Sequence, residues 1–206
     1  MHLASNPVKD KLARGETVLG TFSKFTDPAA AEILAMSGFD FLIFDLEHSP
    51  VEVKDLENLI RACLLGGAIP LARVPGNRPE IILRAMDLGL FGVQVPHVEN
   101  GDDARRALAS VRYRPPFGRR GLAFSQRAAG YGAVPPVDYV RWVEEQTLLV
   151  VQVESLAAFD SMREVLKVEG VDVVFFGPAD LSQSAGTPGQ WDNPEVRRVI
   201  EAPRRS

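Results

Sequence analysis

Short apolar runs alternate with amphipathic segments along most of this 206-residue chain. Each run has the length of a strand and is apolar enough to be buried on both faces. We expect strands at residues 17–23, 39–44, 69–74, 91–98, 148–154 and 171–176. Strands of this kind, separated by helices, form a parallel sheet with the helices outside it. The alternation therefore predicts an α/β fold.

The segments between these runs carry apolar residues at helical spacing. Asp27 and Pro28 are typical of a helix start, and Gly66 and Gly67 are typical of a helix end. We expect helices at residues 28–36, 52–65, 79–88, 99–112, 137–145 and 157–167, and another that begins at Asn193 and Pro194. Residues 1–16 read as a polar lead-in. Residues 113–136 are rich in Gly, Pro and Arg and longer than most connections, so we expect a functional loop there.

Polar residues return at the end of one predicted strand after another. The strand ends read DLEHSP, ARVPG, VPHVE, VQVES and FFGPADLS. This pattern favours a TIM (β/α)8-type barrel over an open doubly wound sheet, which usually gathers its ligand at one switch point. No glycine-rich phosphate fingerprint follows any strand, which argues against nucleotide binding. A barrel of this type typically needs about 250 residues, so we expect only about six of the eight β/α units here.

Composition narrows the class of partner. With 46% hydrophobic residues the chain can bury one core, and we expect a single domain over residues 1–206 that is incomplete at its carboxyl end. A net charge of −4 and a pI near 5.5 give no basic footprint for nucleic acid or for an anionic membrane. The single cysteine, Cys63, lies in an apolar helical segment and favours a reducing compartment. No run of about 18 apolar residues occurs, so we expect a soluble, cytoplasmic protein that acts on a small molecule.

Three titratable residues follow the second predicted strand, namely Asp45, Glu47 and His48. The carboxyl edge of a parallel sheet is where α/β folds place their chemistry. His48 is the natural proton-transfer group, because an imidazole titrates near neutral pH, and Asp45 could orient it. Ordinary loop polarity explains any one of these residues alone, but the cluster favours function.

Arg73 and His97 lie at the ends of the next two predicted strands. A guanidinium suits a substrate carboxylate or a developing enolate, although Arg73 could instead form a structural salt bridge. We interpret His97 as a residue that supports or anchors its loop and not as a catalytic group.

Two carboxylates follow the last two predicted strands. Glu154 ends the fifth strand and Asp180 lies just past the sixth, so adjacent strands would present both to one pocket. Such a pair suits a hard divalent ion such as Mg²⁺ or Mn²⁺, with water and substrate completing the shell. The alternative is that Glu154 caps the helix near Ser155 and that Asp180 caps a turn at Leu181.

Together these motifs resemble one enzyme family. Six segments of the chain are similar to segments of the metal-dependent class II pyruvate aldolases. They are DLEHSP, the Arg of ARVPG, MDLGLFGVQVPHV, RRGLAFSQRAAGYG, VQVES and FFGPADLS. That family cleaves 4-hydroxy-2-oxo-heptanedioate and 2-dehydro-3-deoxyglucarate and belongs with the citrate lyase β-type, phosphoenolpyruvate/pyruvate-binding barrels. The resemblance runs from about Val18 to the region of Ile200.

The resemblance implies a role for each matching residue. His48 would be the catalytic histidine, Arg73 would stabilise the transition state, and Asp87 would raise the basicity of the histidine. The implied metal ligands, for Mg²⁺, Mn²⁺ or Co²⁺, are Glu154 and Asp180, and the implied substrate contacts are Gln152, Asp180 and the backbone of Ala179. Asp87 falls at the amino-terminal side of a barrel, which is the wrong face for its own site. A neighbouring subunit of a homo-oligomer could supply it, so Asp45 stays the candidate within the chain.

The implied reaction is the reversible cleavage of a 4-hydroxy-2-oxo acid to pyruvate and an aldehyde. The metal would polarise the 2-oxo group of this small-molecule substrate. Arg73 would share the enolate charge, and His48, directly or through a water, would remove the 4-hydroxyl proton.

Three alternatives stay open. A Schiff-base aldolase needs a lysine near a strand end, and only Lys24 is so placed. A lyase acting on a coenzyme A thioester needs basic groups, which Arg119, Arg120 and Arg127 could provide. A non-catalytic relative would bind pyruvate-like acids or pack in an assembly. Because two strands are expected to be missing, we also expect open sheet edges, association, reduced stability and weak or no aldolase activity.

Overall fold

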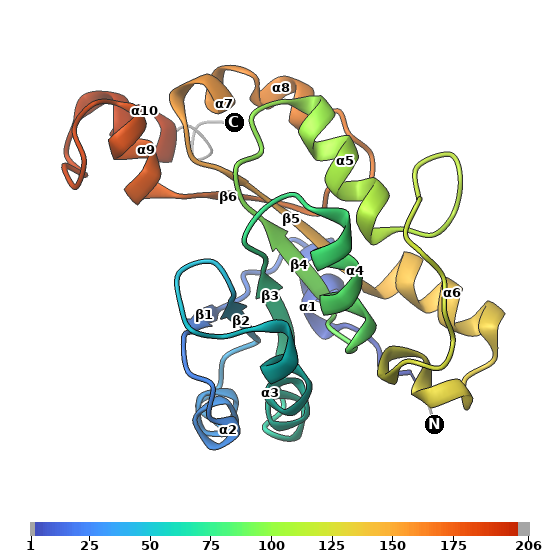
Figure 1. The fold of residues 1–206 in the computed structure, drawn as a ribbon. Helices are drawn as coiled ribbons and strands as arrows, with labels where there is room; N and C mark the ends of the chain where they lie inside the picture. Colours follow the sequence, from blue (N-terminus) through green and yellow to red (C-terminus); the bar gives the residue numbers. More distant parts are fainter. Residues whose placement is uncertain (1–2, 202–206) are drawn as a thin grey trace.

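The computed structural model describes residues 3–201 of the chain. Six parallel strands form one sheet in chain order. The strands are β1 (Gly20–Ser23), β2 (Phe41–Asp45), β3 (Ile69–Arg73), β4 (Gly92–Val95), β5 (Leu148–Val153) and β6 (Val173–Phe176). Figure 1 shows the sheet curling, with helices arranged around its outer side. This is the arrangement of about six units of a (β/α)8 barrel, so the predicted fold class is confirmed.

Most of the helices lie between strands in the sequence and pack on the outer face of the sheet, whereas the first helix packs on the inner cavity and the last two helices form a cluster of their own. They are α1 (Pro7–Ala13), α2 (Pro28–Met36), α3 (Val53–Leu65), α4 (Pro79–Asp87), α5 (Gly101–Val111), the 3₁₀ helix η1 (Arg127–Gly132), α6 (Pro136–Gln146), α7 (Leu156–Asp160), α8 (Met162–Val165), α9 (Pro178–Ser184) and α10 (Pro194–Glu201). Outward strand residues such as Phe44, Val93 and Leu149 are completely buried against helix residues such as Leu56 and Ile82. Each such side chain contributes about 1.5–3 kcal/mol of hydrophobic stabilisation.

The inner face of the sheet encloses a small apolar cavity of about 160 Å³. Alternate strand residues such as Ile43 and Leu71 line it, because successive side chains of a strand point to opposite faces. Phe22 of β1 and Phe175 of β6 both line this cavity, and their rings meet edge to face with centroids 5.9 Å apart. Within residues 3–201, β1 pairs only with β2 and β6 only with β5, so these two edge strands meet through side chains and not through backbone hydrogen bonds.

Helix α1 packs against the amino-terminal end of this cavity. Val8 and Leu12 line the cavity beside the first residues of several strands. The helix begins at Pro7 because Asn6 caps it, with Asn6 Oδ1 accepting from the backbone N–H groups of Val8 (3.1 Å) and Lys9 (3.2 Å). The sequence pattern did not predict this helix, since its seven residues are too short to show a helical period.

Several elements differ from their predicted bounds. Strand β4 ends at Val95 because Pro96 cannot donate to the sheet and His97 has a positive φ of 56°. The helix expected at residues 157–167 is divided at Ser161 into α7 and α8. Helix α9 was not predicted, and the loop at 113–136 contains η1. No helix within residues 3–201 is long and apolar enough to cross a bilayer.

Candidate active site

Asp45 and Arg73 form the central ion pair of the candidate site. They are the last residues of β2 and β3 and stand side by side in the parallel register. Arg73 donates from Nε to Oδ1 of Asp45 (2.9 Å) and from Nη2 to Oδ2 (2.6 Å), which is a bidentate pair. Burial acts to raise the pKa of Asp45, but the bonds from Arg73 and from two backbone N–H groups outweigh it and lower that pKa below its ordinary value.

Other groups surround the Arg73 guanidinium. It lies over the ring of Phe22, 4.9 Å from the centroid, and its Nε lies 3.3 Å from Oε2 of Glu47. Lys24, just after β1, places its Nζ 3.8 Å from Oδ2 of Asp45. None of these contacts uses Nη1 of Arg73, so that nitrogen can donate to a bound anion.

His48 lies at the rim of the site with 56% of its side chain exposed. Its Nε2 is 3.8 Å from Oε2 of Glu47. The backbone N–H groups of Glu47 and His48 each donate to Oδ1 of Asp45 at 3.1 Å, so Asp45 shapes the turn after β2. The expectation that Asp45 orients the His48 ring is therefore corrected, because its carboxylate pairs with Arg73 and contacts His48 only through the backbone.

His97 connects two carboxylates across the site. Its Nε2 lies 3.1 Å from Oε1 of Glu47, and its Nδ1 lies 2.8 Å from Oε1 of Glu154. The backbone N–H of His97 donates to the same Glu154 oxygen at 2.8 Å. These contacts agree with the interpretation of His97 as an anchoring residue. Sequence reasoning assigned no role to Glu47, although its place two residues after Asp45 indicated that it lies at the same edge of the sheet.

Buried amides hold the other oxygen of Glu154. Gln94 Nε2 donates to Oε1 of Gln152, and Gln152 Nε2 donates to Oε2 of Glu154. Sequence reasoning missed Gln94, which shares with Gln152 the inward-facing side of neighbouring strands. Burial raises the pKa of Glu154, and the negative charge of Asp180 raises it further. The hydrogen bonds from Gln152 and from the His97 N–H lower this pKa but do not outweigh burial. A carboxylate whose negative charge is destabilised by burial is a favourable ligand for a cation, because the cation would stabilise that charge.

Glu154 and Asp180 supply the oxygen donors that a hard divalent ion prefers. Asp180 lies in the first turn of α9, next to Ala179. Gly177, at the end of β6, allows the close approach, since a Cβ atom there would lie 2.9 Å from Oε2 of Glu154. Within residues 3–201 no three His, Cys, Asp or Glu side chains are already gathered to hold an ion. The two carboxylates fit a divalent metal, with other ligands completing the shell.

Asp87 lies away from these residues. It ends α4, which leads into the amino end of β4, so it is at the opposite end of the sheet from His48. Its carboxylate pairs with Arg120, whose side chain is fully buried. Arg120 also lies over the ring of Tyr113, 4.8 Å from the centroid. The structure therefore does not bring Asp87 to His48 within one chain.

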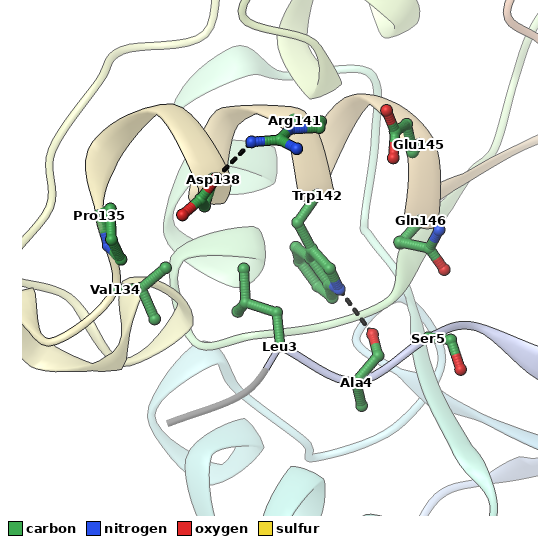
Figure 2. A pocket seen from close by; sticks show the side chains of 10 residues that line it. All are labelled: Leu3, Ala4, Ser5, Val134, Pro135, Asp138, Arg141, Trp142, Glu145 and Gln146. Carbon is green, nitrogen blue, oxygen red and sulfur yellow. Dashed lines mark hydrogen bonds and ion pairs between the residues drawn. The ribbon is translucent and has the colours of Figure 1, made fainter.

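A pocket of about 470 Å³ lies outside the candidate site. Figure 2 shows that the amino-terminal segment at Leu3 and Ala4 forms one wall and that α6 forms the other. The indole N–H of Trp142 donates to the backbone oxygen of Ala4 at 2.6 Å. None of the predicted site residues lines this pocket.

The sequence of the chain matches known aldolases. The HpcH/HpaI aldolase/citrate lyase family model matches residues 19–205. A curated relative, the 2-keto-3-deoxy-L-rhamnonate aldolase of Escherichia coli O1:K1 / APEC, is 41% identical over 201 residues, which are 97% of this chain and 74% of the relative.

Solved structures agree with the sequence relatives. An HpcH/HpaI aldolase/citrate lyase family protein from Burkholderia cenocepacia J2315 superimposes with a TM-score of 0.89 at 34% identity, covering 95% of this chain and 78% of that one. The citrate synthase SbnG superimposes with a TM-score of 0.84 at 30% identity, covering 94% of this chain and 74% of that one. The chain therefore belongs to the HpcH/HpaI aldolase/citrate lyase family, which confirms the family predicted from its motifs.

Proposed function

We propose that this chain is a metal-dependent aldolase that reversibly cleaves a 4-hydroxy-2-oxo acid to pyruvate and an aldehyde. The observation that carries the proposal is the presence of the Asp45–Arg73 pair and the buried Glu154 carboxylate at one edge of the sheet. Such an edge offers a fixed guanidinium for an anionic substrate beside a ligand for a cation. The name of the curated rhamnonate aldolase supports a 2-oxo-3-deoxy sugar acid as the substrate class.

Glu154 and Asp180 would hold the divalent ion, which we take to be Mg²⁺, Mn²⁺ or Co²⁺. A bound ion would supply Lewis-acid polarisation of the 2-oxo group and so favour the pyruvate enolate as a leaving group. The amides of Gln94 and Gln152 keep Glu154 in place, because they form a continuous chain of hydrogen bonds to its Oε2.

The remaining roles follow from where the side chains lie. Arg73 would bind the developing enolate through Nη1, while Asp45 keeps the guanidinium in one orientation. His48, exposed at the rim, would take the proton of the 4-hydroxyl group. Gln152 retains a second amide hydrogen for the substrate, and Ala179 would contribute its backbone.

Asp87 can act on His48 only from another subunit, because the two residues lie at opposite ends of the sheet within one chain. We therefore propose a homo-oligomer in which one chain's Asp87 approaches a neighbour's site. We also place this aldolase in the cytoplasm, without nucleic-acid or membrane partners.

A pyruvate-release assay tests the proposed function. Purified chain would be incubated with a series of 4-hydroxy-2-oxo acids that differ in the aldehyde portion, and pyruvate would be measured by a coupled reduction. We expect turnover with at least one 2-oxo-3-deoxy sugar acid, at a low rate because the sheet has open edges, and its loss in Glu154→Gln. Release of no pyruvate from any acid in the series by folded chain would reject the proposal and favour a non-catalytic relative.

A lyase acting on a coenzyme A thioester is the second candidate, because the family also includes citrate lyase and one structural neighbour is a citrate synthase. Two of the three arginines that were considered for the coenzyme already contact other groups of the chain. Arg120 is buried against Asp87, and Arg127 donates from Nη1 to the backbone oxygen of Leu88 at 2.6 Å. Parallel assays with free acids and with citryl-type thioesters distinguish the two reactions.

A Schiff-base mechanism would require Lys24, whose amine lies near Asp45. Borohydride reduction in the presence of pyruvate would trap a covalent adduct on this lysine. We expect no adduct, and a stoichiometric adduct on Lys24 would replace the metal mechanism.

A further inference from the structure

His97 has geometry that an anchoring role alone does not require. It follows β4 with φ at 56°, in the left-handed region that is uncommon for residues other than glycine, although histidine occurs there more often than most. The backbone N–H already bonds to Glu154 Oε1, so the loop is held without the ring. The imidazole is nevertheless directed at that same oxygen, with Nδ1 at 2.8 Å.

The separation of these two atoms matches that of two ligands on one ion. Metal–nitrogen and metal–oxygen bonds of about 2.1 Å at a right angle place the two donor atoms about 3 Å apart. Nδ1 of His97 and Oε1 of Glu154 have almost this spacing. An ion that replaced the direct contact would therefore need only a small movement of either side chain.

The other ring nitrogen has the partner that a metal-binding histidine usually has. Such a histidine donates its remaining N–H to a carboxylate, which fixes the ring and raises the basicity of the ligating nitrogen. Nε2 of His97 lies 3.1 Å from Glu47 Oε1. Glu47 is itself held, since its side chain is only 10% exposed and its Oε2 lies 3.3 Å from Nε of Arg73.

The site also contains an unsatisfied buried acceptor. Oε2 of Glu47 is buried and accepts no hydrogen bond among the described residues. In the described part of the chain, the three carboxylates of Asp45, Glu47 and Glu154 lie in this cluster, whereas Arg73 and Lys24 are its two cationic side chains within ion-pair distance. A divalent cation would supply the missing positive charge.

We propose that His97 is a third protein ligand, through Nδ1, for the divalent ion that Glu154 and Asp180 hold, and that Glu47 is the positioning residue for its ring. The inference rests on the proposed function, which places the ion at Glu154. The pair of His97 and Glu154 is the preformed part of the site. Asp180, in the first turn of α9, would have to move towards this pair, because no three His, Cys, Asp or Glu side chains are already gathered within residues 3–201. Because imidazole suits Co²⁺, Ni²⁺ and Zn²⁺ better than Mg²⁺, His97 would shift the preference of the site towards those ions.

Calorimetric titration with Co²⁺ and separately with Mg²⁺ tests the inference. The main variant is His97→Gly, since glycine adopts a positive φ freely and keeps the backbone N–H that holds Glu154. The control variants are Glu154→Gln, which removes the proposed ligand, and Lys54→Ala, which changes an exposed residue outside the site. His97→Asn serves as a second variant at the same position, because asparagine also tolerates this conformation, and thermal melting checks that each variant is folded.

We expect His97→Gly to lower the affinity for Co²⁺ by about tenfold or more and the affinity for Mg²⁺ by less than about threefold. Lys54→Ala should bind both ions as the parent does. The visible absorption of bound Co²⁺ should also change in His97→Gly, because a nitrogen ligand is lost.

The outcomes separate this inference from the proposed function. If His97→Gly and His97→Asn bind Co²⁺ as tightly as the parent or more tightly, while Glu154→Gln does not bind it, His97 is not a ligand and only the present inference fails. If the folded parent binds neither ion, the metal site of the proposed function fails as well.

Discussion

At the scale of single residues, the site depends on one buried ion pair. Asp45 and Arg73 are neighbours because β2 and β3 are parallel and in register at their last residues. The sequence alone indicated that both residues lie at one edge, since each ends an apolar run. It could not indicate that they pair with each other, because the register between strands is set by packing of the whole sheet. Because Asp45 and His48 are close in the sequence, Asp45 was expected to contact the His48 ring.

Asp45→Asn should destabilise the chain by about 3–5 kcal/mol, because it leaves Arg73 buried with an incompletely compensated charge. Urea unfolding measures this directly. The matched control is Asp102→Asn, the same change in an exposed pair with Arg105, which should alter stability little. Equal midpoints for Asp45→Asn and the parent would contradict this account of the pair.

The same pair predicts a pH dependence of stability. The pKa of Asp45 is lowered in the folded chain, so its contribution is fully present above the unfolded value of 3.8 and is lost as pH falls through the lower folded value. The melting temperature of the parent should therefore fall on acidification below about pH 4. The melting temperature of Asp45→Asn should fall less over that pH range. An equal fall in melting temperature for the two proteins would show that this carboxylate is not responsible.

His48→Ala should lower pyruvate turnover by about 10²–10⁴-fold, the usual contribution of a positioned general base, without unfolding the chain. The ring is exposed at the rim, so little packing is lost. Lys54→Ala is the control, since Lys54 is an exposed residue on the same side of the chain, at the start of α3. Pyruvate release and circular dichroism would be measured together, and near-parental turnover would remove His48 from the mechanism.

At the scale of elements, the central strands and the helices that follow them could be predicted because their apolar periods are long and clear. Helix α1 could not, since its seven residues owe their start to the Asn6 cap and their burial to a cavity that exists only in the folded sheet. The apolar spacing of residues 157–167 likewise gave no signal of the division of α7 from α8 at Ser161. The positive φ of His97 was hidden because it occurs at a residue other than glycine.

The end of β6 provides an element-scale test. Gly177→Ala would place a methyl group 2.9 Å from Oε2 of Glu154 and 3.1 Å from Nε2 of Gln152, so at least one of them must move. We expect weaker binding of divalent metal by calorimetry, with the fold retained. Gly76→Ala is a suitable control, since its new methyl group would come no closer than 4.0 Å to a neighbouring atom. Unchanged metal affinity in Gly177→Ala would show that the approach of β6 to Glu154 does not matter for the ion.

At the scale of the whole molecule, the described residues form a curled sheet with two edge strands and an apolar inner cavity. Unpaired backbone groups on β1 and β6 can pair with another chain. We expect a protein of these 206 residues to associate in a concentration-dependent manner. Light scattering after size-exclusion chromatography at several concentrations measures this, and a monomer over the whole range would contradict both the edge argument and the proposed homo-oligomer.

The family and the aldolase class of activity were predictable because ordered motifs at successive strand ends are specific, and the comparisons confirm both. The individual roles of the site residues stay predictions, since they depend on contacts with substrate and metal.

The most direct test of the central claim is the metal dependence of pyruvate release from a 2-oxo-3-deoxy sugar acid. The chain would be assayed as purified, after exhaustive chelation, and after addition of Mg²⁺, Mn²⁺ or Co²⁺, with Glu154→Gln in parallel. The account predicts that chelation abolishes release, that at least one of these ions restores it, and that no ion restores it in Glu154→Gln. Undiminished pyruvate release from the fully chelated chain would contradict the account.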